Sequence, residues 1–63
     1  MLINRQIEIF LREQQMPPTT FGRLAARDPR LVLDIRMGRE IRPAMTLRLQ
    51  QFMLHYRAAG SAA

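Results

Sequence analysis

The sequence contains no cysteine and no lysine, and it has no long apolar run. Without cysteine the chain has no disulfide, no thiolate nucleophile and no cysteine ligand for zinc. Its stability therefore has to come from helix packing or association, and a reducing cytoplasm is the compatible compartment. No apolar stretch approaches the roughly 20 residues that span a bilayer, and charged residues interrupt the apolar pattern at the N-terminus, which is untypical of a signal peptide. We therefore expect a cytoplasmic protein with no membrane segment.

Negative charge is scarce, because five acidic residues oppose ten arginines and leave a net charge of +5. Arginine suits bidentate contact with phosphate and with the guanine edge. The exclusive use of arginine is equally compatible with the codon usage of a GC-rich genome, so the inference rests on the sign of the charge. A chain of 63 residues leaves no room for a cleft between two domains, and it buries only about 60% of its unfolded surface. The composition indicates one small basic domain.

Apolar residues recur at spacings of three and four along most of the chain, which is the pattern of amphipathic helices. Pro17 ends the first helix, for which Asn4 is a candidate N-cap. Asp28 is the expected N-cap of the third helix, and Gly38 is expected to close that helix in a left-handed conformation before Pro43 opens the last. We expect helices over residues 2–15, 18–27, 28–37 and 43–57, and a frayed tail over residues 58–63. The predicted fold is all-α, a compact bundle of four or five short helices in one domain over residues 1–57.

The spacing also predicts which side chains pack together. The second helix is expected to bury Phe21, Leu24 and Ala25. Gly22 lies inside this helix at a cost of about 1 kcal/mol relative to alanine, so we expect another helix to approach closely at that position. Leu47 and Leu54 lie seven apart beside the core stripe of the last helix, where they either widen the core or form a dimer contact.

The second and third helices fit the register of a helix-turn-helix. This register requires a small residue early in the first helix, a turn residue four positions later and an apolar residue six positions after that. Gly22, Ala26 and Val32 occupy these three positions. The inward positions then hold Phe21, Ala25 and Ile35. With the terminal glycine, basic loop and proline-started helix that follow, the segment 18–52 resembles the Xre family of Cro-like and lambda-repressor-like DNA-binding domains. It is also similar to short helix-turn-helix proteins of alphaproteobacteria, with Phe-Gly-Arg and Asp-Pro-Arg at matching places.

The turn between these helices departs from the family pattern. The family often has glycine there, whereas this chain has Ala26 and Arg27. Either one of these residues adopts the left-handed conformation, or the second helix continues to Asp28.

The resemblance implies that the third helix lies in the major groove, with its N-terminal residues at base edges. Arg30 would donate two hydrogen bonds to guanine, Leu33 would touch a thymine methyl group, and Asp34 would accept from a cytosine amino group. Pro29 shares this face. Alternatively, Arg30 and Asp34 form an ion pair four residues apart on a solvated surface. The expected contacts to the DNA backbone, at helix ends and loops that reach phosphates, are Thr19, Thr20, Arg23, Arg36, Arg39 and Arg42.

Catalytic and metal-binding patterns are missing from the sequence. His55 is the single histidine, and no second ligand lies at metal-binding spacing. The glutamates at positions 8, 13 and 40 fall in different predicted elements without a nucleophile. We expect no enzyme activity, no metal, no cofactor and no small-molecule substrate.

The leading hypothesis is sequence-specific binding of double-stranded DNA by a small bacterial transcriptional regulator at the nucleoid. It would act as a homodimer on a palindromic site with half-sites about 10 bp apart. The alternative is a protein-interaction module on the same fold, such as an antitoxin or a phage-type inhibitor, since Leu33, Leu47 and Leu54 would be exposed apolar residues. A basic amphipathic peptide on a membrane surface is disfavoured, because prolines and glycines separate the helices and acids interrupt the positive face.

Overall fold

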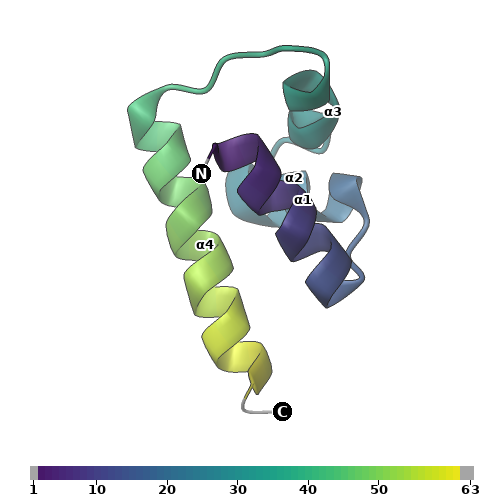
Figure 1. The fold of residues 1–63 in the computed structure, drawn as a ribbon, viewed down its shortest axis with the longest axis vertical. Helices are drawn as coiled ribbons and strands as arrows, with labels where there is room; N and C mark the ends of the chain where they lie inside the picture. Colours follow the sequence, from purple (N-terminus) through teal and green to yellow (C-terminus); the bar gives the residue numbers. More distant parts are fainter. Residues whose placement is uncertain (1, 62–63) are drawn as a thin grey trace.

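The computed structural model describes residues 2–61, and over this part of the chain every regular element is a helix. The four helices are α1 (Ile3–Gln14), α2 (Pro18–Ala26), α3 (Leu31–Arg36) and α4 (Pro43–Ser61) (Figure 1). The predicted all-α bundle is therefore confirmed. With 19 residues, α4 is longer than expected and continues through Ser61, where the sequence predicts a frayed tail from Ala58. The last two residues of that predicted tail lie outside the described part.

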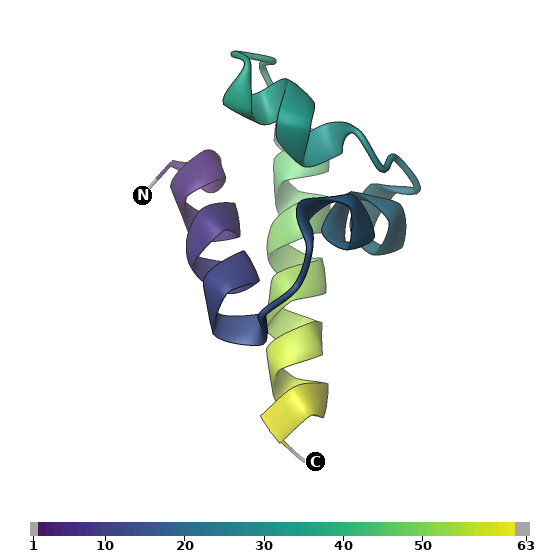
Figure 2. The same ribbon diagram turned by 90° about the vertical axis from the view of Figure 1, so that its right-hand side faces the viewer.

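The helices form two pairs. α1 and α4 run side by side in the same direction, and α3 lies across the end of the bundle at which they begin (Figures 1 and 2). α2 packs against both α3 and α4, and the Arg48 guanidinium of α4 donates from Nε to the Ala25 carbonyl oxygen of α2 at 2.9 Å. The final turns of α4 extend beyond the other helices (Figure 2). α3 thus packs against α2 and α1 on its inner side, and its opposite side is left open.

Aromatic rings join the helices at the centre of the core. Phe10 of α1 is fully buried and makes edge contacts with Phe21 of α2 at 5.6 Å and with Phe52 and Tyr56 of α4 at 6.0 and 5.5 Å between ring centroids. Such pairs contribute about 0.5–1.5 kcal/mol each beyond their buried area. The core is completed by Ile7, Leu11, Met16, Ala25, Leu31, Val32, Ile35, Leu49 and Met53.

Three of the helices are followed by a residue in the left-handed region. These residues are Gln15 (φ 51°), Arg27 (φ 54°) and Gly38 (φ 103°). After α2, the Arg27 N–H donates to the Arg23 carbonyl oxygen and the Asp28 N–H donates to that of Gly22, and each of these spans is one residue longer than in a Schellman motif. The predicted left-handed glycine after the third helix is confirmed. Of the two alternatives for the turn, the structure shows the first, with Arg27 as the residue that adopts the left-handed conformation.

Both predicted N-caps are wrong. The N-cap of α1 is Leu2, and Asn4 already lies within the first turn. α3 begins at Leu31, later than expected, and has Arg30 as its N-cap. The Asp28 carboxylate instead accepts a hydrogen bond from the Arg30 N–H at 3.1 Å, which folds Pro29 into a turn and delays the helix.

Gly22 is the position at which the turn crosses α2. A Cβ at this residue would collide with the carbonyl oxygen of Asp28 and lie 3.3 Å from Leu31 Cβ. The close approach expected from the sequence is therefore confirmed, but the approaching backbone belongs to the turn, and α3 contributes only the Leu31 side chain. This contact defines the inward face of α2, and it leaves Leu24, predicted to be buried, 54% exposed.

Candidate nucleic-acid interface

α2, the turn and α3 form one unit whose inner face is apolar. Leu31, Val32 and Ile35 of α3 are buried against the other helices. Because side chains repeat every 3.6 residues, Arg30, Leu33 and Met37 are left on the opposite side, where Leu33 is 45% and Met37 is 87% exposed. The outer side of α3 therefore combines one arginine with two apolar side chains.

The three predicted base contacts differ in their surroundings. Arg30 is exposed, and its side chain has no hydrogen-bond or ion-pair partner in residues 2–61, whereas its backbone is fixed by Asp28. Leu33 lies on the same exposed side. Asp34 is half-buried and accepts a hydrogen bond from Arg39 rather than from Arg30. The alternative pairing of Arg30 with Asp34 is thus absent from this part of the chain.

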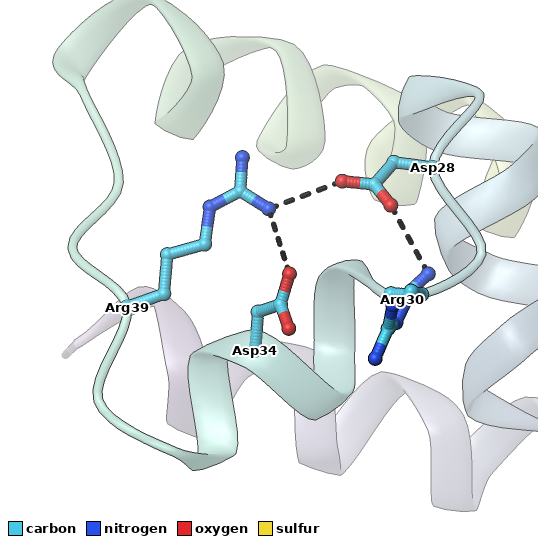
Figure 3. A network of polar contacts seen from close by, with 4 residues as sticks. All are labelled: Asp28, Arg30, Asp34 and Arg39. Atoms are coloured by element: carbon cyan, nitrogen blue, oxygen red, sulfur yellow. Dashed lines mark hydrogen bonds and ion pairs between the residues drawn. The ribbon is translucent and has the colours of Figure 1, made fainter.

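Arg39 bridges the two ends of α3 (Figure 3). Its Nη1 donates to Asp28 Oδ2 at 3.0 Å, before the helix, and to Asp34 Oδ2 at 3.3 Å, in the helix. The hydrogen bond from Arg39, followed by that from the Arg30 N–H, lowers the pKa of the Asp28 carboxyl below its ordinary value. Asp28 in turn raises the pKa of the Arg39 guanidinium. Arg39 therefore ties the turn to the helix.

Arg36, a predicted backbone contact, is turned toward α1. Its Nε and Nη2 bind the two carboxylate oxygens of Glu8 at 2.7 and 2.9 Å, in a bidentate pair across 28 residues of sequence. These hydrogen bonds, with the charges of Arg36 and then Arg12, lower the pKa of Glu8 against a weaker opposing effect of burial. Arg36 holds α3 against α1 in this arrangement, so its guanidinium is already occupied by a carboxylate.

The remaining predicted backbone contacts are accessible. Arg23 in α2 and Arg42 before α4 are exposed without a side-chain partner in the described residues. Thr19 is exposed and Thr20 half-buried, and both lie in the first turn of α2 directly after Pro18.

The excess positive charge is distributed unevenly. Four of the five acids are paired with arginines, through Glu8–Arg36, Asp28–Arg39, Asp34–Arg39 and Glu13–Arg57. In the part of the chain that the structure describes, the arginines without a side-chain partner are Arg5, Arg12, Arg23, Arg27, Arg30 and Arg42. Four of these belong to α2, the turn and the loop after α3. The sequence pattern indicates Arg27 only as a residue of the turn, whereas the structure shows that its side chain is exposed.

A groove runs between α1 and α4. Its volume is about 270 Å³, and it is lined by Gln6, Ile9, Gln50, Met53, Leu54 and Arg57. Leu54 is 64% exposed, and Leu47, one heptad earlier on α4, is 55% exposed, so neither leucine widens the core. The Arg57 guanidinium is neutralised by Glu13 at 2.6 Å and lies over the Phe10 ring at 5.3 Å. The groove thus has apolar and amide walls with no unpaired charge.

The described residues form no site of the metal-binding or membrane-spanning kind. Among residues 2–61 no three histidine, cysteine or acidic side chains lie close enough to hold a metal ion. His55 is exposed on α4. None of the described helices is long and apolar enough to cross a membrane.

Comparison of the chain with protein-family models, with curated proteins and with solved structures finds no match. The Xre resemblance therefore stays a prediction from the residues of the segment 18–52. The physical support for a function has to come from the outer side of α3 and the arginines around it.

Proposed function

We propose that this protein binds double-stranded DNA sequence-specifically, as a small transcriptional regulator of the Xre type with α3 in the major groove. The supporting observation is the α2–turn–α3 unit, which presents Arg30 and Leu33 outward while unpaired arginines flank it on α2, the turn and the following loop. A bacterial cytoplasm and nucleoid are the corresponding location. No catalytic step is part of this proposal.

Base recognition in this proposal depends mainly on Arg30. Its backbone is fixed by the Asp28 carboxylate, and its side chain is free to donate two hydrogen bonds to guanine O6 and N7. Leu33 would contact a thymine methyl group one helical turn along. We assign no base to Asp34, because Arg39 already occupies its carboxylate.

Phosphate contacts would orient the helix without reading sequence. Arg23, Arg27 and Arg42 are available for this role, together with the backbone N–H groups of Thr19 and Thr20 at the start of α2. Six arginine–phosphate contacts, three from each copy of a dimer, would lower affinity by roughly a thousandfold between 50 and 200 mM salt. Strong salt dependence is therefore an expected property.

We also propose that the active form is a homodimer on a palindromic site. Two copies of a chain with a net charge of +5 repel each other, so association is favoured at a face without unpaired charge. The α1–α4 groove, with Leu54 at its edge and Leu47 beside it, is such a face. Two-fold symmetry would place the two α3 helices at half-sites about 10 bp apart.

The test begins with a selection of bound duplexes from a random pool, followed by fluorescence anisotropy with the selected duplex. Arg30→Ala is expected to weaken binding by about tenfold or more and to relax the preference for one base pair. Arg12→Ala is the matched control, because Arg12 is also exposed and unpaired but lies toward the end of α1 that points away from α3 (Figure 2). Equal losses for the two variants would contradict base reading by Arg30.

A second function is favoured by the apolar part of the same surface. Leu33 of α3 and its C-cap residue Met37, which is 87% exposed, lie four residues apart, as anchors do in a helix that docks into a protein groove. The alternative is thus a protein-interaction module, such as an antitoxin or a phage-type inhibitor. Pull-down from nuclease-treated lysate discriminates the two, since one stoichiometric protein partner together with no DNA affinity would favour this alternative.

A further inference from the structure

We propose that Asp28 and Asp34 are positioning residues that hold Arg39 ready to bind a phosphate with its free edge. This inference rests on the proposed DNA binding for its biological meaning. It assigns the two carboxylates a supporting role, in place of the direct base contact predicted for Asp34.

The side-chain hydrogen bonds of Arg39 use only one nitrogen of its guanidinium, Nη1. Both carboxylates accept from Nη1, at 3.0 and 3.3 Å, and the side chain remains 42% exposed (Figure 3). Nε and Nη2 have no hydrogen-bond partner among residues 2–61. These two nitrogens form the fork that binds carboxylates and phosphates through parallel hydrogen bonds.

The same protein shows how that fork is used. Arg36 binds Glu8 with its Nε and Nη2 at 2.7 and 2.9 Å. In Arg39 this edge is left open while the opposite corner is anchored. An anionic oxygen pair would therefore dock on Arg39 in the geometry that Glu8 adopts on Arg36.

Hydrogen bonds hold this arrangement at both ends. The Arg39 backbone N–H donates to the Asp34 carbonyl oxygen at 2.9 Å, within the turn that closes α3. The other oxygen of Asp28 is held by the Arg30 N–H at 3.1 Å. Because a free arginine loses much rotamer freedom when it binds, a guanidinium that is already ordered loses less on contact with phosphate.

A simple charge argument predicts the opposite outcome for these acids. Two carboxylates beside one arginine leave a local negative charge, which repels DNA, so removing one of them should strengthen binding. If the carboxylates instead order Arg39, removing one should weaken binding although the net charge becomes more positive. The sign of the effect separates the two explanations.

The experiment compares Asp34→Ala with Glu40→Ala by anisotropy with a selected duplex. Glu40 is the matched control, because it is exposed, lies next to Arg39 and has no side-chain partner in the described residues. Glu40→Ala is expected to leave affinity unchanged or to raise it. Asp34→Ala is expected to lower affinity at least about threefold, and this loss should disappear when Arg39→Ala is already present. Equal strengthening by Asp34→Ala and Glu40→Ala would overturn the inference, and circular dichroism verifies that each variant is folded.

A second readout does not depend on DNA binding. NMR follows the Arg39 Nε–H resonance while wild type and Asp34→Ala are titrated with inorganic phosphate. The inference predicts a saturable shift in wild type that weakens in the variant, whereas no shift, or equal shifts, would overturn it. If phosphate shifts the wild-type resonance more than that of Asp34→Ala, but wild type binds no duplex, the proposed function fails while the role of Arg39 stands.

Discussion

A glycine inside a helix ordinarily weakens it, but at Gly22 a larger residue would not fit. The Asp28 carbonyl oxygen occupies the space of a Cβ, because the turn folds back over α2 at this point. The residue type is therefore dictated by the contact that sets the angle between α2 and α3. A larger residue at Gly22 should therefore disturb the packing of the whole α2–turn–α3 unit.

Gly22→Ala tests this contact. Alanine would stabilise an unobstructed helix by about 0.5–1 kcal/mol, but here the collision is expected to lower the free energy of unfolding by about 1–3 kcal/mol. Gly60→Ala is the control, because apart from the neighbouring backbone of α4 itself nothing lies within 4 Å of a Cβ at that position. Urea unfolding followed by circular dichroism measures both, and a stabilised Gly22→Ala would show that the turn does not press on α2.

Spacing predicts which residues lie on the buried face of a helix. It does not predict the burial of residues whose surroundings depend on the turn. Phe21, Ala25 and Ile35 are buried as the periodic pattern indicates. Leu24 satisfies the same spacing, yet it is exposed because the carbonyl over Gly22 fixes which side of α2 faces inward. Gly22 indicates from the sequence that something approaches α2 closely, but it does not indicate that the turn at Asp28 is the approaching segment.

At the scale of the elements, long-range ion pairs between arginine and carboxylate side chains connect segments that the sequence pattern predicts independently of one another. Glu8 and Arg36 join α1 to α3, and Arg39 joins the turn to α3. The helices could be predicted because proline, glycine and periodicity act locally. These pairs could not, since they depend on the late start of α3 and on the Gly38 turn, which returns Arg39 toward the helix.

The Glu8–Arg36 link should make stability depend on pH. The folded pKa of Glu8 is lowered from 4.5, so the stabilisation is present above pH 4.5 and is lost as the pH falls through the lower folded value. Glu8→Gln is therefore expected to lower Tm modestly near neutral pH, because the pair is partly exposed. In strongly acidic buffer the difference from wild type should close.

Thermal unfolding of Glu8→Gln at several pH values provides the measurement. Glu40→Gln is a suitable reference, since no described residue pairs with the Glu40 side chain. A Tm difference for Glu8→Gln that is constant with pH would show that the ion pair does not link α1 to α3.

At the scale of the whole molecule, charge and apolar surface are segregated. The α1–α4 groove has no unpaired charge, while most arginines without partners surround α2, the turn and the loop after α3. A dimer formed at the groove would therefore leave both candidate DNA-binding surfaces exposed. The sequence left open whether Leu47 and Leu54 serve the core or a dimer, and their exposure removes the first possibility.

Leu54→Glu is expected to abolish self-association, because it places a charge at the edge of the proposed dimer interface. Sedimentation equilibrium should give the mass of two 7.4 kDa chains for wild type and of one chain for the variant. Leu24→Glu is matched in exposure, at 54% against 64%, but lies on α2 and should remain dimeric. A monomeric wild type at high concentration would contradict the dimer.

The central claim is that the α2–turn–α3 unit binds double-stranded DNA, and titration of wild type into a pool-selected duplex tests it most directly. At about 50 mM salt we predict saturable binding that exceeds binding to a scrambled duplex, with a steep loss of affinity at about 200 mM. Absence of binding at the lower salt, or equal binding to both duplexes, would contradict the account.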